Sequence, residues 1–309
     1  MELDEAHKAA VEFHNEYYQT SREAVVANLD KQQTELMDRA TSRGASAFLT
    51  AFPSQRLNFN LTRQEFEDVI ALRYGFRPKG LPDRCGCGKD FTVSHALSCL
   101  TGGLVHMRHD KVRDMMISLL RQVCSDVECE PHLQPTPDER TECGDQARAD
   151  GRARGLWRPG VNAYFDVLVT NTAADAHRHH LTAETLARYE EAKKSKYVER
   201  ILNLDHGSFT PLVFAASGAR GTEAADFMKR VATKIASKTK DSYSKVVSLI
   251  SVRLSFNIQK SAVHCLRGAH TKKRQPPNHN SQEEIEETFN SVPADVLLCE
   301  NVPPFSHFQ

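Results

Sequence analysis

A single acidic residue interrupts an apolar run near the middle of the chain. Asp166 lies inside the run from Tyr164 to Val169, in which all the remaining residues are aromatic, β-branched or leucine. That composition is typical of a buried β-strand, so we expect a strand over residues 164–170. An ionised carboxylate in such a strand costs several kcal/mol unless it is paired or bound to a metal. The fold must therefore place a compensating group beside Asp166.

Two further charged residues, Asp150 and Lys193, lie within a few dozen residues of Asp166. Asp150 belongs to a short predicted strand that can form a hairpin with the strand of Asp166, so that the two carboxylates converge. Phosphodiester cleavage by divalent ions needs hard oxygen ligands for Mg²⁺ and a cation or base beside them. We therefore consider Asp150 and Asp166 as candidate catalytic residues and magnesium ligands, with Lys193 as the catalytic cation.

The lysine belongs to a predicted helix over residues 182–202. Lys196 follows on the same face, and both can reach the acidic pair if the apolar end of that face packs against the sheet. Two simpler interpretations stay open: the lysines form a solvated helix face, and Asp150 beside Gly151 is a turn residue. The face changes from apolar to basic at intervals of three and four, through Leu186, Tyr189, Lys193, Lys196 and Arg200.

Four candidate metal ligands, Cys85, Cys87, His95 and Cys99, lie within fifteen residues. Three cysteines and one histidine are the number and type of ligand that a structural tetrahedral zinc site uses. The pattern predicts a zinc knuckle that binds structural Zn²⁺. The alternative is that these are reduced cysteines in a small apolar core, and we interpret the other cysteines of the chain in that way.

The whole chain excludes several classes of protein. Its 309 residues and 40% hydrophobic content suffice for a packed core, and Lys+Arg and Asp+Glu both number 40. Nucleic-acid binding would then depend on local basic surface rather than on net charge. Eight unevenly spaced cysteines and the lack of an apolar signal segment predict an intracellular protein, nuclear or cytoplasmic and not secreted. No apolar run reaches the roughly 18 to 20 residues that cross a bilayer, so we expect no membrane association.

Composition divides the chain into four parts. Residues 1–60 are a helical N-terminal segment, and residues 61–109 contain a helix and the CCHC-type zinc knuckle. Residues 110–268 alternate between helical and strand patterns, as an α/β domain does. Residues 269–309 are polar and charged, which is typical of a mostly disordered tail.

Periodicity predicts the individual elements. Thr62 and Glu65 have the spacing of a capping box, which indicates a helix over residues 63–74. The later elements that we expect are a helix over 111–124, strands over 126–133, 148–153, 164–170 and 209–216, and helices over 182–202, 222–237 and 241–266.

Several polar residues near these elements have open roles. His106 and His109 belong to the start of the helix after the knuckle, where they can form a phosphate-binding surface with Arg108 and Lys111. A solvated helix face is an equal alternative. Glu130 is a candidate further carboxylate, although an exposed glutamate at a strand end is the simpler interpretation.

Taken in order, short motifs over about residues 60–268 resemble the C-terminal end of non-LTR retrotransposon polyproteins. In that family a zinc knuckle precedes a restriction-endonuclease-like domain. The resemblance implies a core of the PD-(D/E)xK type, a mixed sheet flanked by helices, preceded by the small knuckle and N-terminal helices. The motifs are the Cys-His cluster, Arg108-His109-Asp110, Glu130-Pro131-His132, the Asp150 segment, Phe165-Asp166-Val167 and Lys193 with Lys196-Tyr197.

The same resemblance implies an activity. Asp150 matches the aspartate of the proline-aspartate motif, Asp166 the strand aspartate, and Lys193 the lysine on the following helix, with Lys196 in the same motif. Ala149 stands where the family usually has proline. The implied reaction is nicking of a DNA strand with Mg²⁺ or Mn²⁺, which serves target-primed reverse transcription. The implied partner is DNA, or the RNA of the element.

Two other classes of function stay open. A catalytically inactive nucleic-acid-binding remnant, or a zinc knuckle adopted by a host, would bind DNA or RNA in a salt-sensitive manner without cleaving it. A zinc-stabilised protein-interaction domain is favoured by the balanced charge.

Overall fold

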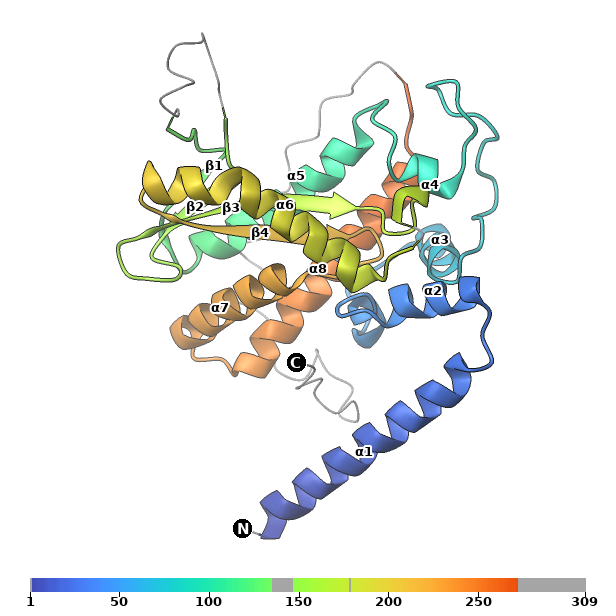
Figure 1. Ribbon diagram of the computed structural model, residues 1–309, viewed down its shortest axis with the longest axis horizontal. Helices are drawn as coiled ribbons and strands as arrows, with labels where there is room; N and C mark the ends of the chain where they lie inside the picture. Colours follow the sequence, from blue (N-terminus) through green and yellow to red (C-terminus); the bar gives the residue numbers. More distant parts are fainter. Residues whose placement is uncertain (1, 135–146, 178, 272–309) are drawn as a thin grey trace. The chain divides into compact units, whose positions relative to one another are not determined.

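The computed structural model describes residues 2–134, 147–177 and 179–271 (Figure 1). It contains two compact units, Met1–Asp38 and Arg39–Gln309. Residues 135–146 and most of the predicted tail, residues 272–309, lie outside the described residues, so the disorder of the tail stays a prediction.

The first unit consists mainly of the long helix α1 (Glu2–Val26), and α2 (Lys31–Thr41) follows it. The sequence of this segment is rich in strong helix formers, which accounts for both helices. Helix α1 exposes large apolar side chains along its length, among them Phe13 and Tyr17.

The second unit is built around a four-stranded mixed sheet in the order β1–β2–β3–β4. The first three strands pair in antiparallel fashion, whereas β3 and β4 are parallel. A parallel pair needs a crossover connection, and helix α6 (Thr182–Asn203) supplies it. This α/β fold, with helices beside a mixed sheet, confirms the general architecture that the sequence predicts. The strands are β1 (Ser125–Cys129), β2 (Gly151–Arg154), β3 (Asn162–Thr170) and β4 (Ser208–Ala215).

Helices lie on both faces of the sheet (Figure 1). Successive side chains of a strand point to opposite faces, so β3 contributes to two different environments. Phe165 and Val167 pack in the largest core with α5 (Leu104–Arg121), α7 (Thr222–Thr239) and α8 (Tyr243–Arg267). Tyr164 and Leu168 contact α6 on the other face, which is also the face of Asp166. None of the helices in the described ranges is long and apolar enough to span a membrane.

The short 3-10 turn η1 (Ala47–Thr50) is followed by α3 (Arg63–Arg73), which begins with the predicted capping box. The Thr62 hydroxyl accepts a hydrogen bond from the Glu65 amide at 3.2 Å, and the Glu65 carboxylate accepts one from the Thr62 amide at 2.7 Å. The buried Asp68 of this helix accepts two hydrogen bonds from Arg267, at 2.8 and 2.6 Å. This bidentate ion pair joins α3 to the end of α8.

The knuckle segment, residues 77–103, packs onto the chain that leaves α8. It contains the short helix α4 (Val93–Ala96). The ring of Phe91 meets the edge of the His270 ring, with 5.2 Å between the centroids. Gly86 approaches the same residue so closely that a Cβ atom there would lie 1.8 Å from the His270 carbonyl oxygen. The knuckle is therefore part of the packed second unit.

Several element boundaries differ from the predictions. Strand β2 begins at Gly151 instead of residue 148, so Asp150 directly precedes the strand, and Arg148 forms only an isolated bridge with His132. Helix α5 begins at Leu104, after Gly103 in a left-handed conformation (φ 71°), so it extends well before the predicted start at residue 111. Strand β1 ends at Cys129 instead of reaching residue 133, because Glu130 has φ 53° and cannot continue an extended strand.

Candidate active site

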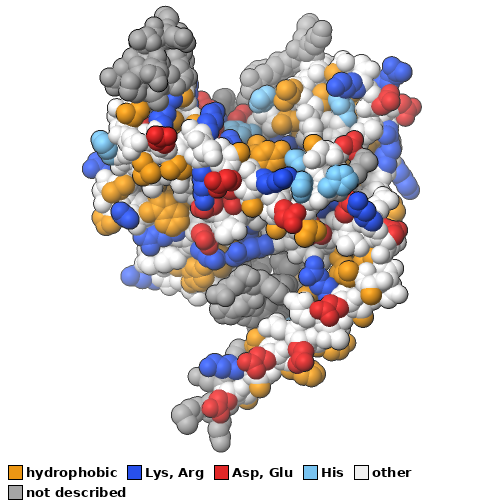
Figure 2. Space-filling view, viewed as in Figure 1, with side chains coloured by type: hydrophobic (Ala, Val, Ile, Leu, Met, Phe, Trp, Pro, Cys, Tyr) orange, Lys and Arg blue, Asp and Glu red, His pale blue; other side chains and the backbone are white. Residues whose placement is uncertain are grey.

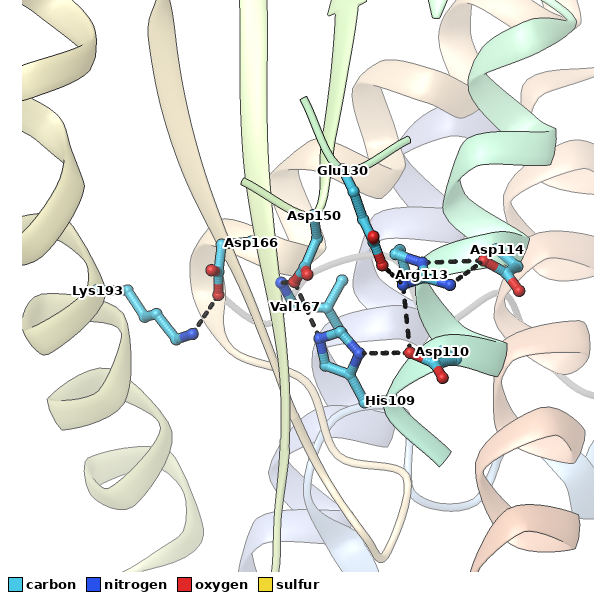
Figure 3. A network of polar contacts seen from close by, with 9 residues as sticks. All are labelled: His109, Asp110, Arg113, Asp114, Glu130, Asp150, Asp166, Val167 and Lys193. Atoms are coloured by element: carbon cyan, nitrogen blue, oxygen red, sulfur yellow. Dashed lines mark hydrogen bonds and ion pairs between the residues drawn. The ribbon is translucent and has the colours of Figure 1, made fainter. Parts of the chain in front are cut away.

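The Asp166 carboxylate meets Lys193 between β3 and α6 (Figure 3). Lys193 Nζ forms an ion pair and a hydrogen bond with Asp166 Oδ2. The Asp166 side chain is only 7% exposed, and the Lys193 side chain is 23% exposed. Tyr197, one turn further along α6, is also hydrogen-bonded to Asp166. The group that compensates this buried carboxylate is therefore the lysine of the next helix, supported by a tyrosine.

Asp150 directly precedes β2 and lies beside β3. Its amide donates to the Phe165 carbonyl at 3.1 Å, one residue beyond the paired residues of the two strands. Its carboxylate Oδ2 accepts a hydrogen bond from the Val167 amide at 2.5 Å. The Asp150 carboxylate therefore accepts the hydrogen bond that the Val167 amide would otherwise donate to a backbone carbonyl of β2. Antiparallel pairing of β2 and β3 thus brings Asp150 and Asp166 to the same part of the sheet.

The two carboxylates influence one another. Burial raises the pKa of Asp166, and the negative charge of Asp150 raises it further, against the opposing effects of Lys193 and Tyr197. Burial and the charge of Asp166 raise the pKa of Tyr197 to about 12, so its hydroxyl stays protonated and can donate to Asp166. The two carboxylates thus interact in a largely buried place, where Asp166 is paired with Lys193 and Asp150 faces His109.

His109 of α5 joins this site although its place in the sequence did not predict it. Its Nε2 lies 3.0 Å from Asp150 Oδ2, and its Nδ1 lies 3.3 Å from Asp110 Oδ1. Burial disfavours the imidazolium, but the hydrogen bonds and charges of Asp150 and Asp110 outweigh this effect and raise the pKa of His109. The contact joins residues 41 positions apart, and a local sequence pattern carries no signal for it.

The prediction that the neighbouring Arg108 forms part of a phosphate-binding surface is wrong. Arg108 is only 2% exposed, and its guanidinium donates to the Val169 carbonyl at 3.0 Å. Arg108 lies on the inward side of α5 and cannot contribute to a phosphate-binding surface. His106 and Lys111 of the same helix are exposed.

Polar contacts continue along α5 to the end of β1 (Figure 3). Arg113 forms ion pairs with Asp110, at 3.2 Å, and with Glu130. The Glu130 amide donates to the Asp150 carbonyl at 3.1 Å. The Glu130 carboxylate is therefore held by an arginine, in agreement with the simpler interpretation of a glutamate at a strand end.

The two candidate lysines occupy different environments. Lys193 contacts Asp166, whereas Lys196 is exposed and its ammonium lies 4.7 Å from the centroid of the Tyr197 ring. The structure thus pairs Lys193 with Asp166 and places Asp150 close enough to affect the pKa of Asp166. A catalytic role for Lys196 stays a prediction.

The cysteine and histidine ligands form a second site. The ligand atoms of Cys85, Cys87, His95 and Cys99 all lie within 4.8 Å of one another. The Sγ atoms of Cys85 and Cys99 are 3.7 Å apart, and Cys87 Sγ lies 3.3 Å from His95 Nε2. A tetrahedron with Zn–S bonds of about 2.3 Å has edges of about 3.8 Å between sulfur atoms. This cluster can therefore bind a metal such as zinc, as the sequence predicts.

The acidic site offers a different set of donors. Within the described residues, the cysteine–histidine cluster is the one group of three or more candidate ligands at such close spacing. The acidic site instead supplies the two carboxylates of Asp150 and Asp166. Magnesium is commonly held by one or two protein carboxylates, with water in its remaining positions. Two neighbouring carboxylates are therefore suitable ligands for a hard divalent cation.

No family model matches the chain, and no curated protein sequence is significantly similar to it. The structure itself shows an α/β protein with a Cys₃His cluster that can bind a metal, and with Asp150, Asp166 and Lys193 beside β3. The family resemblance of the short motifs stays a prediction.

Proposed function

We propose that this protein is a metal-dependent DNA endonuclease that nicks one strand, with a core of the PD-(D/E)xK type. The observation that carries the proposal is the convergence of Asp150, Asp166 and Lys193 from two adjacent strands and the following helix. The resemblance of the short motifs to non-LTR retrotransposon polyproteins supports the same activity. In that setting the nick would prime reverse transcription by a polymerase on another part of the element.

In this proposal Asp150 and Asp166 hold Mg²⁺ or Mn²⁺. When bound, the ion offsets negative charge on the phosphate and lowers the pKa of water. Lys193 supplies a fixed positive charge beside the developing negative charge, where a preorganised cation stabilises the transition state. His109 and Tyr197 are positioning residues, since they hold the carboxylates of Asp150 and Asp166.

The zinc knuckle has a separate role in the proposal. Structural zinc in the Cys85–Cys99 segment would stabilise the knuckle and its packing on the end of α8. Exposed His106 and Lys111 on the next helix are available to DNA, or to the RNA of the element. On the surface in Figure 2, acidic and basic side chains are interspersed, so nucleic-acid contacts must come from local basic groups.

The decisive experiment is nicking of supercoiled plasmid by the zinc-loaded protein with Mg²⁺ or Mn²⁺. We expect the parent protein to nick, and Asp166→Asn and Asp150→Ala to lose at least about a hundredfold in rate. Asp166→Asn should keep the thermal stability of the parent, because the amide retains the shape of the side chain and removes a buried charge. Equal nicking by the parent and both folded variants would reject this assignment of the site.

A second candidate function is a catalytically inactive nucleic-acid-binding module. It is favoured by the contacts that already occupy the acidic side chains: Asp150 Oδ2 accepts from Val167 and His109, and Asp166 is paired with Lys193. Such contacts also suit a purely structural role. A parent protein that shifts the mobility of the plasmid without nicking it, and whose binding survives Asp150→Ala, would support this candidate.

A further inference from the structure

A basic groove lies along α7, on the side of the sheet opposite α6. Its volume is about 460 Å³. Three of its cations, Arg230, Lys234 and Lys238, recur at intervals of four residues and therefore lie on one side of the helix. The hydroxyl groups of Thr233 and Ser237 lie between them, and Val123 completes the lining.

These three cations have no acidic partner among the described residues. The Arg230 guanidinium donates to the carbonyls of Leu156 and Trp157, at 2.8 and 3.2 Å. Lys238 Nζ donates to the Gln122 carbonyl at 2.5 Å. Neutral carbonyls orient these side chains but leave their charge in place.

Two other lysines, Lys229 and Lys245, do have acidic partners. Lys229 pairs with Asp226 at 3.0 Å, and Lys245 pairs with Asp241 at 2.8 Å. Acidic side chains therefore pair with these two lysines but not with the three cations that line the groove. The Thr233 hydroxyl already donates to the Lys229 carbonyl at 2.9 Å, so it is the unpaired cations that make the groove suited to an anion.

Two elements connect the groove to the acidic site. Helix α5 runs from His109, beside Asp150, to its C-cap Gln122, and thirteen residues at about 1.5 Å each span roughly 20 Å. Strand β2 leads from Asp150 to the turn at Gly155, and five residues at about 3.3 Å each span roughly 17 Å. Duplex DNA rises about 3.4 Å per base pair, so this distance corresponds to about five or six base pairs.

We propose that the α7 groove binds the phosphate backbone of a nucleic acid, in a duplex about five or six base pairs from the phosphodiester at the acidic site. Lysine, arginine and hydroxyl side chains bind phosphate oxygens without reading the bases, so the contact would add affinity and orientation but no sequence preference. The inference rests on the proposed function for the location of the reacting phosphodiester. The binding of phosphate at the groove can be tested without any cleavage.

The test compares the full-length, zinc-loaded parent with the double variant Lys234→Gln, Lys238→Gln. Binding of labelled duplex DNA and of single-stranded DNA, each about 20 nucleotides long, is measured without Mg²⁺ at roughly 50 to 200 mM salt. Loss of two phosphate contacts should lower the salt slope of the logarithm of the binding constant by about 2, and the affinity at 0.15 M salt by roughly thirtyfold. The two DNA arms show whether the phosphates belong to duplex or to a single strand.

Two further variants control the result. Lys8→Gln with Lys31→Gln changes the net charge equally on exposed residues of the first unit, and should bind as the parent does. Lys234→Arg with Lys238→Arg keeps the charge and should retain the affinity. Equal thermal stability of all variants shows that the groove substitutions leave the fold intact.

Two outcomes would overturn the inference: a parent that binds neither DNA, or a Gln double variant that binds both as tightly as the parent. Failure of the proposed nuclease function would give a different experimental result. If the parent does not nick plasmid while the groove variant loses DNA affinity, the nuclease proposal fails and the groove assignment stands.

Discussion

At the scale of single residues, the position of Asp150 depends on groups from two other elements. The Val167 amide of β3 and His109 of α5 both contact Asp150 Oδ2, at 2.5 and 3.0 Å. A carboxylate that must share a metal ion with Asp166 tolerates little displacement, because catalytic geometry is sensitive to shifts of about 1 Å. Residues that hold a metal ligand commonly affect activity almost as much as the ligand itself.

We expect His109→Ala to lower the rate of plasmid nicking by about 10- to 100-fold and to raise the Mg²⁺ concentration needed for half-maximal rate. His109→Gln should recover part of the loss, because its amide can donate to Asp150. His14→Ala, an exposed histidine of α1 in the first unit, is the control and should be as active as the parent. Equal losses at both histidines would show that the effect does not come from the contact with Asp150.

Gly86 is a second residue at which the surrounding atoms determine whether a substitution is tolerated. A Cβ atom at Gly86 would lie 1.8 Å from a backbone carbonyl oxygen, so Gly86→Ala must displace the chain after α8. We expect this variant to lose about 3 kcal/mol of unfolding free energy in denaturant titrations of the zinc-loaded protein. Gly88→Ala meets no atom within 4 Å but has a φ of +90°, so it should cost only about 1 kcal/mol. Similar losses at both positions would mean that the close approach of Gly86 has no energetic importance.

At the scale of elements, α6 links the acidic site to the start of α7. Glu190 of α6 accepts a hydrogen bond from the Glu223 amide at 3.0 Å and is buried. This amide belongs to the first turn of α7, whose amides have no partner within the helix. Gly221 leaves space for the contact, because a Cβ atom there would lie 2.0 Å from Glu190 Oε1. Burial raises the pKa of Glu190, against the opposing effect of the Glu223 amide.

The raised pKa has a defined consequence for stability. Because the folded state binds this proton more tightly than the unfolded state, Glu190 is destabilising above its folded pKa, and the effect disappears as the pH falls below the unfolded value. Glu190→Gln keeps an oxygen acceptor without the charge, so we expect up to about 1 kcal/mol of added stability at pH 7 and a smaller gain at pH 5. Urea unfolding at the two pH values measures the difference, with the exposed Glu191→Gln as control. A variant less stable than the parent at pH 7 would contradict the argument.

At the scale of the whole molecule, the second unit has several separate buried clusters. The largest joins the sheet to α5, α7 and α8. A smaller one contains the metal ligands Cys85 and Cys99 together with Phe91, and reaches α8 through Leu266. Because the two clusters have different members, loss of the knuckle metal should have local effects.

We therefore expect chelation of zinc to unfold the knuckle segment and to loosen the last turn of α8, while β3 and β4 stay protected. Hydrogen exchange measured by mass spectrometry should show at least about tenfold faster exchange in the first two regions only. Cys99→Ser should reproduce this pattern, whereas Cys124→Ser, outside the cluster, should leave the zinc content unchanged. A uniform loss of protection across the sheet would show that the knuckle supports the whole unit.

The sequence by itself determined the features that depend on neighbours along the chain. The capping box at Thr62, the apolar strand around Asp166 and the amphipathic helices after residue 181 all follow from spacing within a few residues. The Cys-His cluster was equally predictable, because its four ligands lie within fifteen residues and the chain between them can only form a tight loop. Along α5, the apolar periodicity also indicated the buried face, which contains Val112, Met115 and Leu119.

Only the tertiary structure decided which groups meet on those faces. The contact of His109 with Asp150, the burial of Arg108 against Val169 and the pairing of Arg113 with Glu130 join residues 41, 61 and 17 positions apart. Periodicity reports that a side chain faces inward, but not which partner lies there. Hydrogen bonds and ion pairs depend on distances of a few tenths of an ångström, and these distances are set by the packing of whole helices against the sheet.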